Sequence, residues 1–167
     1  MLKALRVSIL LFLFLMLHIS ASTCSAEKMI VIKLKDKTLE FYDAGTLIKK
    51  YDVRVGKKPT PTPTGDGYIY EKRKRPVFRY IDPPNKGKVI KYVTLGSGKT
   101  IKVPRNKMRS LGFRINGYDT DKYSIHSTNH TDTIGKAISN GCVGMRIEDM
   151  LEFYPLIEVN TKVTIEP

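Results

Sequence analysis

Short runs of β-favouring residues, many with alternating apolar and polar side chains, make up most of the chain from Met29 onward. Runs of this kind predict strands. The first three cover residues 29–34, 38–42 and 47–55, and the turn residues at 43–45 separate the second run from the third. Their close spacing predicts an antiparallel meander at the start of the domain.

Proline determines the next segment. Pro59, Pro61 and Pro63 occur within residues 59–67. Because proline lacks an amide donor and fixes φ, we expect a rigid extended loop there rather than a helix. Strand character then returns in four short runs, at residues 68–70, 77–81, 88–95 and 99–103.

The apolar period changes from that of a strand to that of a helix near the C-terminus. The positions with helical spacing are Ile147, Met150, Leu151, Tyr154 and Ile157. They predict a helix over residues 147–157, with an irregular last turn because of Pro155. Residues 161–165 alternate again and predict a closing strand. Several short strands with one late helix predict a mainly β domain with a sandwich or barrel-like core.

A leader-like segment precedes this pattern. Lys3 and Arg6 come before an apolar run at residues 7–19, and small, polar residues follow as far as Ala26. This order is typical of a secretory signal peptide. The apolar run is shorter than the roughly 20 residues that a transmembrane helix needs. An uncleaved membrane anchor is the alternative interpretation.

We expect signal cleavage after Ala26, with Ala21 as the second candidate position. Residues 1–26 are therefore interpreted as a signal peptide and residues 27–167 as a single catalytic domain, which suits a chain of 167 residues. The protein is then expected to be exported, to the periplasm or the cell-wall space.

Composition and charge narrow the class of partner. Hydrophobic residues make up 41% and charged residues 27%, as in folded globular chains. The formal net charge of +13 indicates an acidic partner, and the leader holds only two of the basic residues. Since little nucleic acid is present outside the cytoplasm, we predict an anionic cell-envelope surface instead of nucleic acid. The basic stretch at residues 71–75 is either a solvated hairpin rim or a contact to such a polymer.

Cys142 and His126 are the main candidate catalytic residues. Removal of the leader would leave Cys142 as the last cysteine, which excludes an internal disulfide and indicates a reactive thiol. The alternative is a small buried hydrophobic side chain. Gly141 lets the backbone approach a substrate, and the amides of Gly141 and Cys142 can point at a developing oxyanion. His126 can deprotonate a thiol and then protonate a leaving amine, and an imidazolium stabilises a neighbouring thiolate.

A third histidine in the chain, His130, is interpreted as a loop residue. It has no metal-ligand spacing with His126 and Cys142. Neither a metal nor a cofactor is therefore predicted.

Two separated motifs resemble one known family. Residues 125–143 resemble the catalytic signature of YkuD-type L,D-transpeptidases, which is a histidine, a spacer and then Ser-x-Gly-Cys followed by an aliphatic residue. Residues 62–65, Thr-Pro-Thr-Gly, follow Val-Gly-Lys at residues 55–57 and resemble that family's other recurring element. The two motifs occur in the expected order.

The resemblance implies a mainly β fold. The expected domain is a β-sandwich-like L,D-transpeptidase catalytic domain of mixed sheets with one or two short helices near the C-terminus. It also implies peptidoglycan stem peptides as substrates. In that reaction the cysteine attacks the third stem residue, expels the terminal D-alanine and forms a thioester. The side-chain amine of a neighbouring stem then accepts the acyl group, which leaves a 3-3 cross-link.

The resemblance also assigns roles to individual residues. Cys142 matches the nucleophile, and His126 matches the general base that later acts as the acid. Gly141 and the Cys142 amide match the oxyanion donors. The carbonyl of Ser127 is the expected orienter of the imidazole.

Three further positions are expected at the substrate. Ser139 matches the Ser/Thr position of the motif, where it is expected to shape the loop. Asn140 replaces a histidine that is frequent in the family. Many members carry arginine two residues after the cysteine, where this chain has Gly144. Arg146 lies on the same side of an extended segment and is predicted to reach a substrate carboxylate. A surface ion pair is the alternative for Arg146.

Three functions are compatible with these observations. The first is an exported cysteine transpeptidase. The second is an L,D-carboxypeptidase or related amidase that uses water as the acceptor. The third is a basic wall-binding module without catalysis, which the positive charge and Gly144 suggest.

Overall fold

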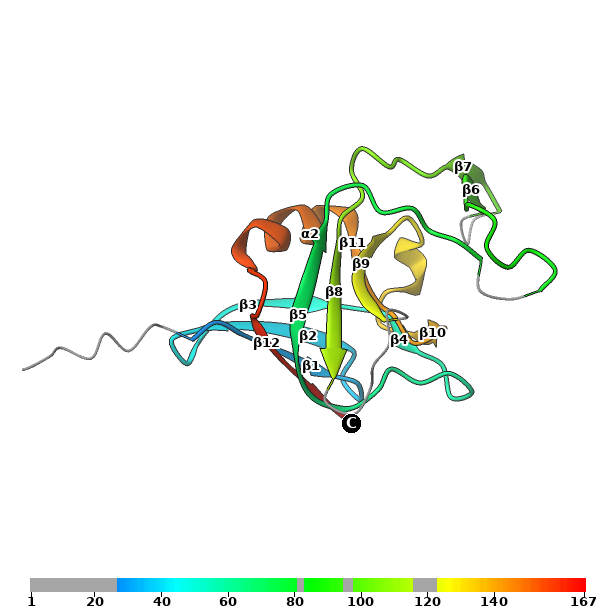
Figure 1. Cartoon of the computed structure of the whole chain (residues 1–167). Helices are drawn as coiled ribbons and strands as arrows, with labels where there is room; N and C mark the ends of the chain where they lie inside the picture. The colour runs from blue at the N-terminus through cyan, green and yellow to red at the C-terminus, as the bar shows by residue number, and fades with distance from the viewer. Residues whose placement is uncertain (1–26, 81–82, 95–97, 116–122) are drawn as a thin grey trace, which may run out of the picture.

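The computed structural model describes residues 27–80, 83–94, 98–115 and 123–167 (Figure 1). The predicted signal peptide, with Cys24 and both candidate cleavage positions, lies outside the described residues, and so do residue 81 and residues 95–97 of the predicted strand region. Within the described part of the chain, no helix is long and apolar enough to cross a membrane.

An eight-stranded mixed sheet forms most of the domain. Its spatial order is β11-β9-β8-β5-β12-β1-β2-β3. In chain order the strands are β1 (Met29–Lys33), β2 (Thr38–Asp43), β3 (Thr46–Asp52), β5 (Gly65–Arg73), β8 (Ser110–Ile115), β9 (Ser124–Thr128), β11 (Val143–Arg146) and β12 (Lys162–Glu166). The pairs β1–β12 and β11–β9 are parallel, and the other neighbours are antiparallel. The predicted N-terminal meander, β1 to β3, and the closing strand, β12, are confirmed.

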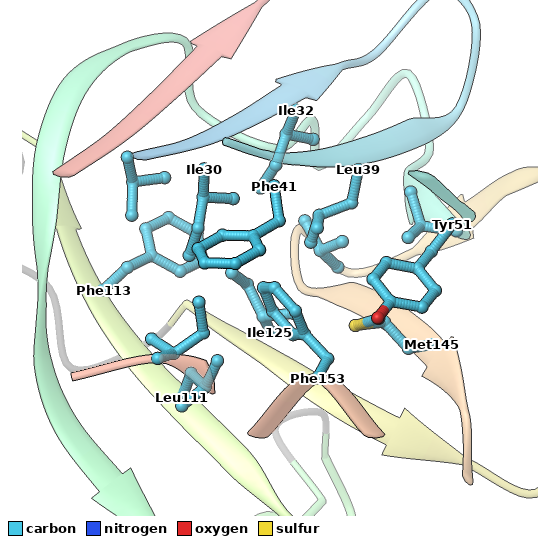
Figure 2. Close-up of a cluster of buried hydrophobic side chains, with 14 of the residues drawn as sticks. Ile30, Ile32, Leu39, Phe41, Tyr51, Leu111, Phe113, Ile125, Met145 and Phe153 are labelled. Carbon is cyan, nitrogen blue, oxygen red and sulfur yellow. The ribbon is translucent and has the colours of Figure 1, made fainter. Parts of the chain in front are cut away.

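The sheet curls so that its two halves enclose one core. Figure 2 shows Phe41 of β2 facing the side chains of Phe113 on β8 and Ile125 on β9. The helix α2 (Ile147–Phe153) supplies Phe153, whose ring meets that of Phe41 edge-on at 6.0 Å between centroids. All four side chains are at most 2% exposed, and burial of such apolar surface is the main driving force of folding. The predicted sandwich-like, mainly β fold is confirmed.

Two small sheets complete the fold. The parallel pair β4 (Val55–Gly56) and β10 (Ala137–Ser139) lies near the catalytic motif. The antiparallel pair β6 (Tyr92–Thr94) and β7 (Thr100–Lys102) belongs to residues 74–109, which join β5 to β8 and are called the arm below. Figure 1 shows the arm extending well beyond the main sheet.

Several predicted boundaries differ from the structure. The proline-rich loop ends at Thr64, because residues 65–67 already belong to β5. The predicted strand at residues 47–55 ends at Asp52 and resumes only as the two residues of β4. In the arm, the predicted strands shrink to β6, β7 and an isolated bridge between Arg79 and Val89.

The C-terminal helix is shorter than predicted. The α-helix ends at Phe153, and a 3-10 turn (Tyr154–Leu156) follows, because Pro155 has no amide to continue the α-helical ladder. A second 3-10 turn (Thr131–Thr133) lies between β9 and β10.

The basic stretch at residues 71–75 is not uniformly solvated. Lys72 lies 4.5 Å above the ring of Tyr154 and donates to the carbonyl of Ile157. Residues 73–75 are exposed. Only the second half of the stretch therefore fits a solvated rim.

Candidate active site

A cavity of about 350 Å³ lies between the arm and the strands that carry the predicted catalytic residues. His126 and Cys142 both line this cavity, together with Arg54 from the segment between β3 and β4. The arm contributes Phe78 and Tyr80. The fold therefore brings the histidine and the cysteine, 16 positions apart in the sequence, to one solvent-accessible space.

His126 lies on β9, between the edge strand β11 and β8. It pairs with Ser110 of β8 on one side and with Gly144 of β11 on the other. Its Nδ1 lies 2.9 Å from the carbonyl oxygen of Ser127. A carbonyl only accepts hydrogen bonds, so Nδ1 carries the proton and the neutral ring keeps Nε2 as an acceptor. This tautomer is the one that a general base needs.

The surroundings of His126 keep the ring neutral. The side chain is 9% exposed, and the ring of Phe78 covers it at a centroid distance of 4.9 Å. Burial lowers the pKa of His126 to about 4, the positive charge of Arg54 acts in the same direction, and the Ser127 carbonyl opposes them. A resting imidazolium beside a thiolate, as the sequence suggested, is therefore disfavoured. Near neutral pH the structure instead favours a neutral imidazole.

Cys142 lies in a tight turn between β10 and β11. Its Sγ accepts a hydrogen bond from the Ser124 hydroxyl at 3.8 Å. Ser139 stabilises this turn with two hydrogen bonds. Its hydroxyl donates to the Cys142 carbonyl at 2.6 Å and accepts from the Gly141 amide at 3.1 Å. Ser139 also lines the cavity.

The backbone of the turn requires glycine at position 141. Its φ of +107° strains any L residue, and an added Cβ would lie 2.4 Å from Cε1 of Tyr123. Only glycine fits this position. The Gly141 amide donates to the Ser139 hydroxyl in this structure. The oxyanion role of the Gly141 and Cys142 amides stays a prediction.

The last two predicted substrate contacts lie in different places. Asn140 is exposed and lines the cavity. Arg146 does not line it, because this residue precedes α2 and forms an ion pair with Asp149 at 3.6 Å. This ion pair matches the alternative given for Arg146, and its predicted reach to a substrate carboxylate stays untested.

The segment that contains the Thr-Pro-Thr-Gly motif packs against the turn that carries Cys142. The hydroxyl of Thr62 accepts a hydrogen bond from the Gly56 amide at 2.9 Å. An added Cβ at Gly56 would lie 2.4 Å from the Thr62 nitrogen, so the two segments need this close approach. The Lys57 amide donates to the Ser139 carbonyl at 3.0 Å, and the Pro61 carbonyl lies against Gly141. The two sequence motifs are therefore in contact.

Several lining residues were missed by the sequence analysis, among them Arg54, Phe78 and Tyr80. Phe78 and Tyr80 carried no signal beyond strand propensity. Arg54 occupies a polar position in an alternating run, and only the missing side chain at Gly144 hinted at it. No group of three or more His, Cys, Asp or Glu side chains that would suit a metal ion is found in the described ranges.

Comparisons with known proteins agree with the resemblance of the two motifs. A family model described as the YkuD L,D-transpeptidase catalytic domain matches residues 27–165. A putative L,D-transpeptidase YkuD from Bacillus licheniformis is 30% identical over 138 residues, which are 83% of this chain and 65% of that protein.

Solved structures agree in fold. An L,D-transpeptidase from Mycobacterium smegmatis has a TM-score of 0.64 at 17% identity, covering 85% of this chain and 59% of that one. L,D-transpeptidase 3 from Mycobacterium tuberculosis, in complex with a faropenem-derived adduct, has a TM-score of 0.64 at 14% identity, covering 85% and 62%. The chain spans less than two thirds of the length of each of these three relatives.

The solved structures establish the fold, and the family model extends over nearly all of the described domain. Together with the paired motifs, this match leads to one assignment. The chain belongs to the YkuD family of L,D-transpeptidase catalytic domains.

Proposed function

We propose that this protein is a cysteine L,D-transpeptidase of peptidoglycan, with Cys142 as the nucleophile and His126 as the general base and acid. The observation that carries the proposal is the hydrogen bond of His126 Nδ1 to the Ser127 carbonyl, in a cavity that Cys142 also lines. This bond leaves Nε2 as a proton acceptor. A neutral buried imidazole and a thiol form the arrangement that nucleophilic catalysis requires.

The first half-reaction transfers the stem peptide to the enzyme. His126 takes the thiol proton of Cys142, and the sulfur attacks the carbonyl carbon of the L-configured centre of the third stem residue. The oxyanion that develops is stabilised by the Cys142 amide. The C–N bond then breaks, His126 returns the proton to the leaving D-alanine amine, and a thioester remains on Cys142.

The second half-reaction transfers the acyl group to an acceptor. The side-chain amine of a neighbouring stem attacks the thioester carbonyl and gives a proton to His126. Collapse of the intermediate expels the thiolate, which recovers the proton from His126. The product is a 3-3 cross-link. Water in place of the amine would give a tripeptide instead.

We further propose export and attraction to an anionic envelope polymer. The leader-like residues 1–26 support export, to the periplasm or cell-wall space. The arm carries eleven Lys or Arg residues and one Asp, and it borders the cavity. A basic surface beside the active site raises the local concentration of an anionic polymer, and salt weakens this attraction.

The product mixture tests the proposed reaction. The protein and its Cys142→Ala variant are incubated with disaccharide-tetrapeptide, and the products are separated by mass spectrometry. Cross-linked dimer made only by the wild type is the expected result. Tripeptide monomer without dimer would replace the transpeptidase with a carboxypeptidase. The absence of both products, with no adduct on Cys142, would contradict catalysis and leave a binding module.

Co-sedimentation with insoluble cell wall tests the charge proposal. A Lys74→Gln, Arg75→Gln variant is expected to bind less than the wild type at low salt. The matched control neutralises two exposed lysines of the main body, Lys35→Gln and Lys162→Gln. Equal binding of the two variants would contradict a specific role of the arm.

A further inference from the structure

Arg54 and Gly144 are direct neighbours at the active site. Their backbones form a bridge, in which each amide donates to the other residue's carbonyl at 2.9 Å. Gly144 has no side chain, and that of Arg54 fills the vacant space. A Cβ added at Gly144 would lie 2.5 Å from Nε and 2.7 Å from Cγ of Arg54. The arginine therefore excludes any larger residue at position 144.

The Arg54 guanidinium is incompletely satisfied. One terminal nitrogen donates to the Thr133 hydroxyl at 3.3 Å, whereas the buried Nε has no hydrogen-bond partner. Among the described residues, Arg54 forms no ion pair. Burying a cation without an anion costs free energy. A carboxylate entering the cavity would offset that cost and bind in a forked geometry.

The positive charge of Arg54 interacts electrostatically with Cys142 and His126. Burial lowers the pKa of Arg54, and electrostatic interactions with Cys142 and Asp132 act in the opposite direction. Arg54 in turn helps to lower the pKa of His126. Since a guanidinium stays protonated in proteins, Arg54 is a permanent positive charge beside the nucleophile.

We propose that Arg54 forms the carboxylate-binding subsite of this active site, and that it replaces from another segment of the chain the side chain that Gly144 lacks. The subsite deepens the proposed function and rests on it for the identity of the ligand, which is a carboxylate of the donor stem peptide. Two carboxylates of the stem fit this chemistry, the terminal one of D-alanine and the side-chain one of the third residue. The second experiment below distinguishes them.

Alkylation of Cys142 tests the charge without any peptidoglycan substrate. Iodoacetate is anionic and iodoacetamide is neutral, and both react with the same thiolate. The ratio of their rate constants therefore cancels the thiolate fraction and reports the local charge. Trypsin cleaves after Lys136, and the peptide that follows, residues 137–146 in the wild type, contains Cys142 as its one cysteine in every variant, so its labelling can be followed separately from Cys24 in the full chain.

The expected result is a loss of preference for the anion. Arg54→Met should lower the iodoacetate-to-iodoacetamide ratio about tenfold, because one unit charge near the sulfur is removed. Arg54→Lys should keep most of the ratio. Arg146→Met is the matched control, because Arg146 lies outside the cavity lining, and its ratio should equal that of the wild type. An unchanged ratio in Arg54→Met, or an equal loss in Arg146→Met, would overturn the proposal.

Relocating the arginine covers the case in which Arg54→Met misfolds. The double variant Arg54→Gly, Gly144→Arg returns a guanidinium to the same space and should recover most of the ratio. A ratio as low as that of Arg54→Gly alone, in a folded double variant, would contradict the proposed exchange of positions. Because the assay needs no turnover, it can succeed even where the proposed transpeptidase reaction fails.

Donor analogues identify the carboxylate. The wild type is compared on tetrapeptide donors that carry a carboxamide at the terminal position or at the third-residue side chain. One of the two analogues should lose about tenfold or more in kcat/KM with the wild type and lose little more with Arg54→Met. Equal discrimination by both enzymes against both analogues would exclude a carboxylate contact at Arg54.

Discussion

Arg54 and Gly144 lie side by side where the two edges of the main sheet approach each other. Arg54 follows the edge strand β3, Gly144 belongs to the opposite edge strand β11, and two backbone hydrogen bonds of 2.9 Å join them. Cys142 lies two residues before Gly144. The contact between the two sheet edges therefore also positions Cys142, the proposed nucleophile.

Gly144→Ala tests how tightly Arg54 and Gly144 pack between the two sheet edges. The added Cβ would meet the Arg54 side chain at 2.5 Å, so we expect unfolding to become easier by about 1 to 3 kcal/mol. Urea unfolding measures the change. The same substitution in an Arg54→Ala background should cost much less, because the obstructing atoms are gone. Equal costs in both backgrounds would show that the backbone of Gly144, and not the Arg54 side chain, sets the requirement.

The buried imidazole predicts a specific dependence of stability on pH. The pKa of His126 falls from 6.5 to about 4 on folding, so the unfolded chain takes up this proton at a higher pH than the folded one. The resulting stability is fully present above pH 6.5 and is lost as the pH falls through 4.

Between pH 7 and pH 4 we therefore expect the wild type to lose roughly 3 kcal/mol more than His126→Gln, measured by urea unfolding. Gln cannot titrate, so it serves as the reference for all other groups. Parallel losses in the two proteins would mean that His126 titrates normally in the folded state.

Phe78 is predicted to maintain that low pKa. Its ring lies over His126, and its removal would admit water and favour the charged imidazole. In Phe78→Ala the pKa of His126 should rise from about 4 toward 6.5, as followed by the NMR shifts of the imidazole. Tyr92→Ala is the control, because Tyr92 is an arm residue that is 58% exposed and does not line the cavity. A pKa that moves in neither variant would assign the shift to burial within the sheet and to the charge of Arg54.

Much of the fold follows from the sequence, but two central strands do not. The meander, the closing strand and the late helix are encoded by local apolar periodicity. Strands β8 and β9 were missed, because Gly112 and the polar residues His126 and Ser127 interrupt their patterns. In the structure His126 and Ser127 are buried, and His126 Nδ1 and the Ser127 hydroxyl have hydrogen-bond partners, which single-sequence patterns do not reveal.

In the candidate site, too, some features can be predicted from local sequence and others depend on the fold. The Cys142 and His126 motif identifies itself through residue types at a recognisable spacing. The partnership of Arg54 and Gly144 does not, because it joins positions that are 90 residues apart and depends on a sheet pairing. The ion pair of Arg146 with Asp149 depends on where α2 begins, since the two residues are neighbours only once the helix has formed.

Ser139 is predicted to act through the shape of the catalytic turn. Ser139→Ala removes both hydrogen bonds to the turn, the one to the Cys142 carbonyl and the one from the Gly141 amide. We expect kcat to fall about tenfold or more with little change in KM, since the nucleophile is displaced while the rest of the cavity persists. Steady-state kinetics on the tetrapeptide donor separates the two constants. A change confined to KM would instead make Ser139 a substrate contact.

The central claim is that Cys142 carries the acyl group between donor and acceptor. Rapid mixing with a tetrapeptide donor whose third-residue side-chain amine is blocked, so that it cannot act as the acceptor, followed by acid quench and intact-protein mass spectrometry, tests it directly. The account predicts a mass increase equal to the donor without its terminal D-alanine, located on the peptide of residues 137–146 and absent from Cys142→Ala. Donor cleavage by the Cys142→Ala variant at the wild-type rate, or an adduct on any other residue, would contradict it.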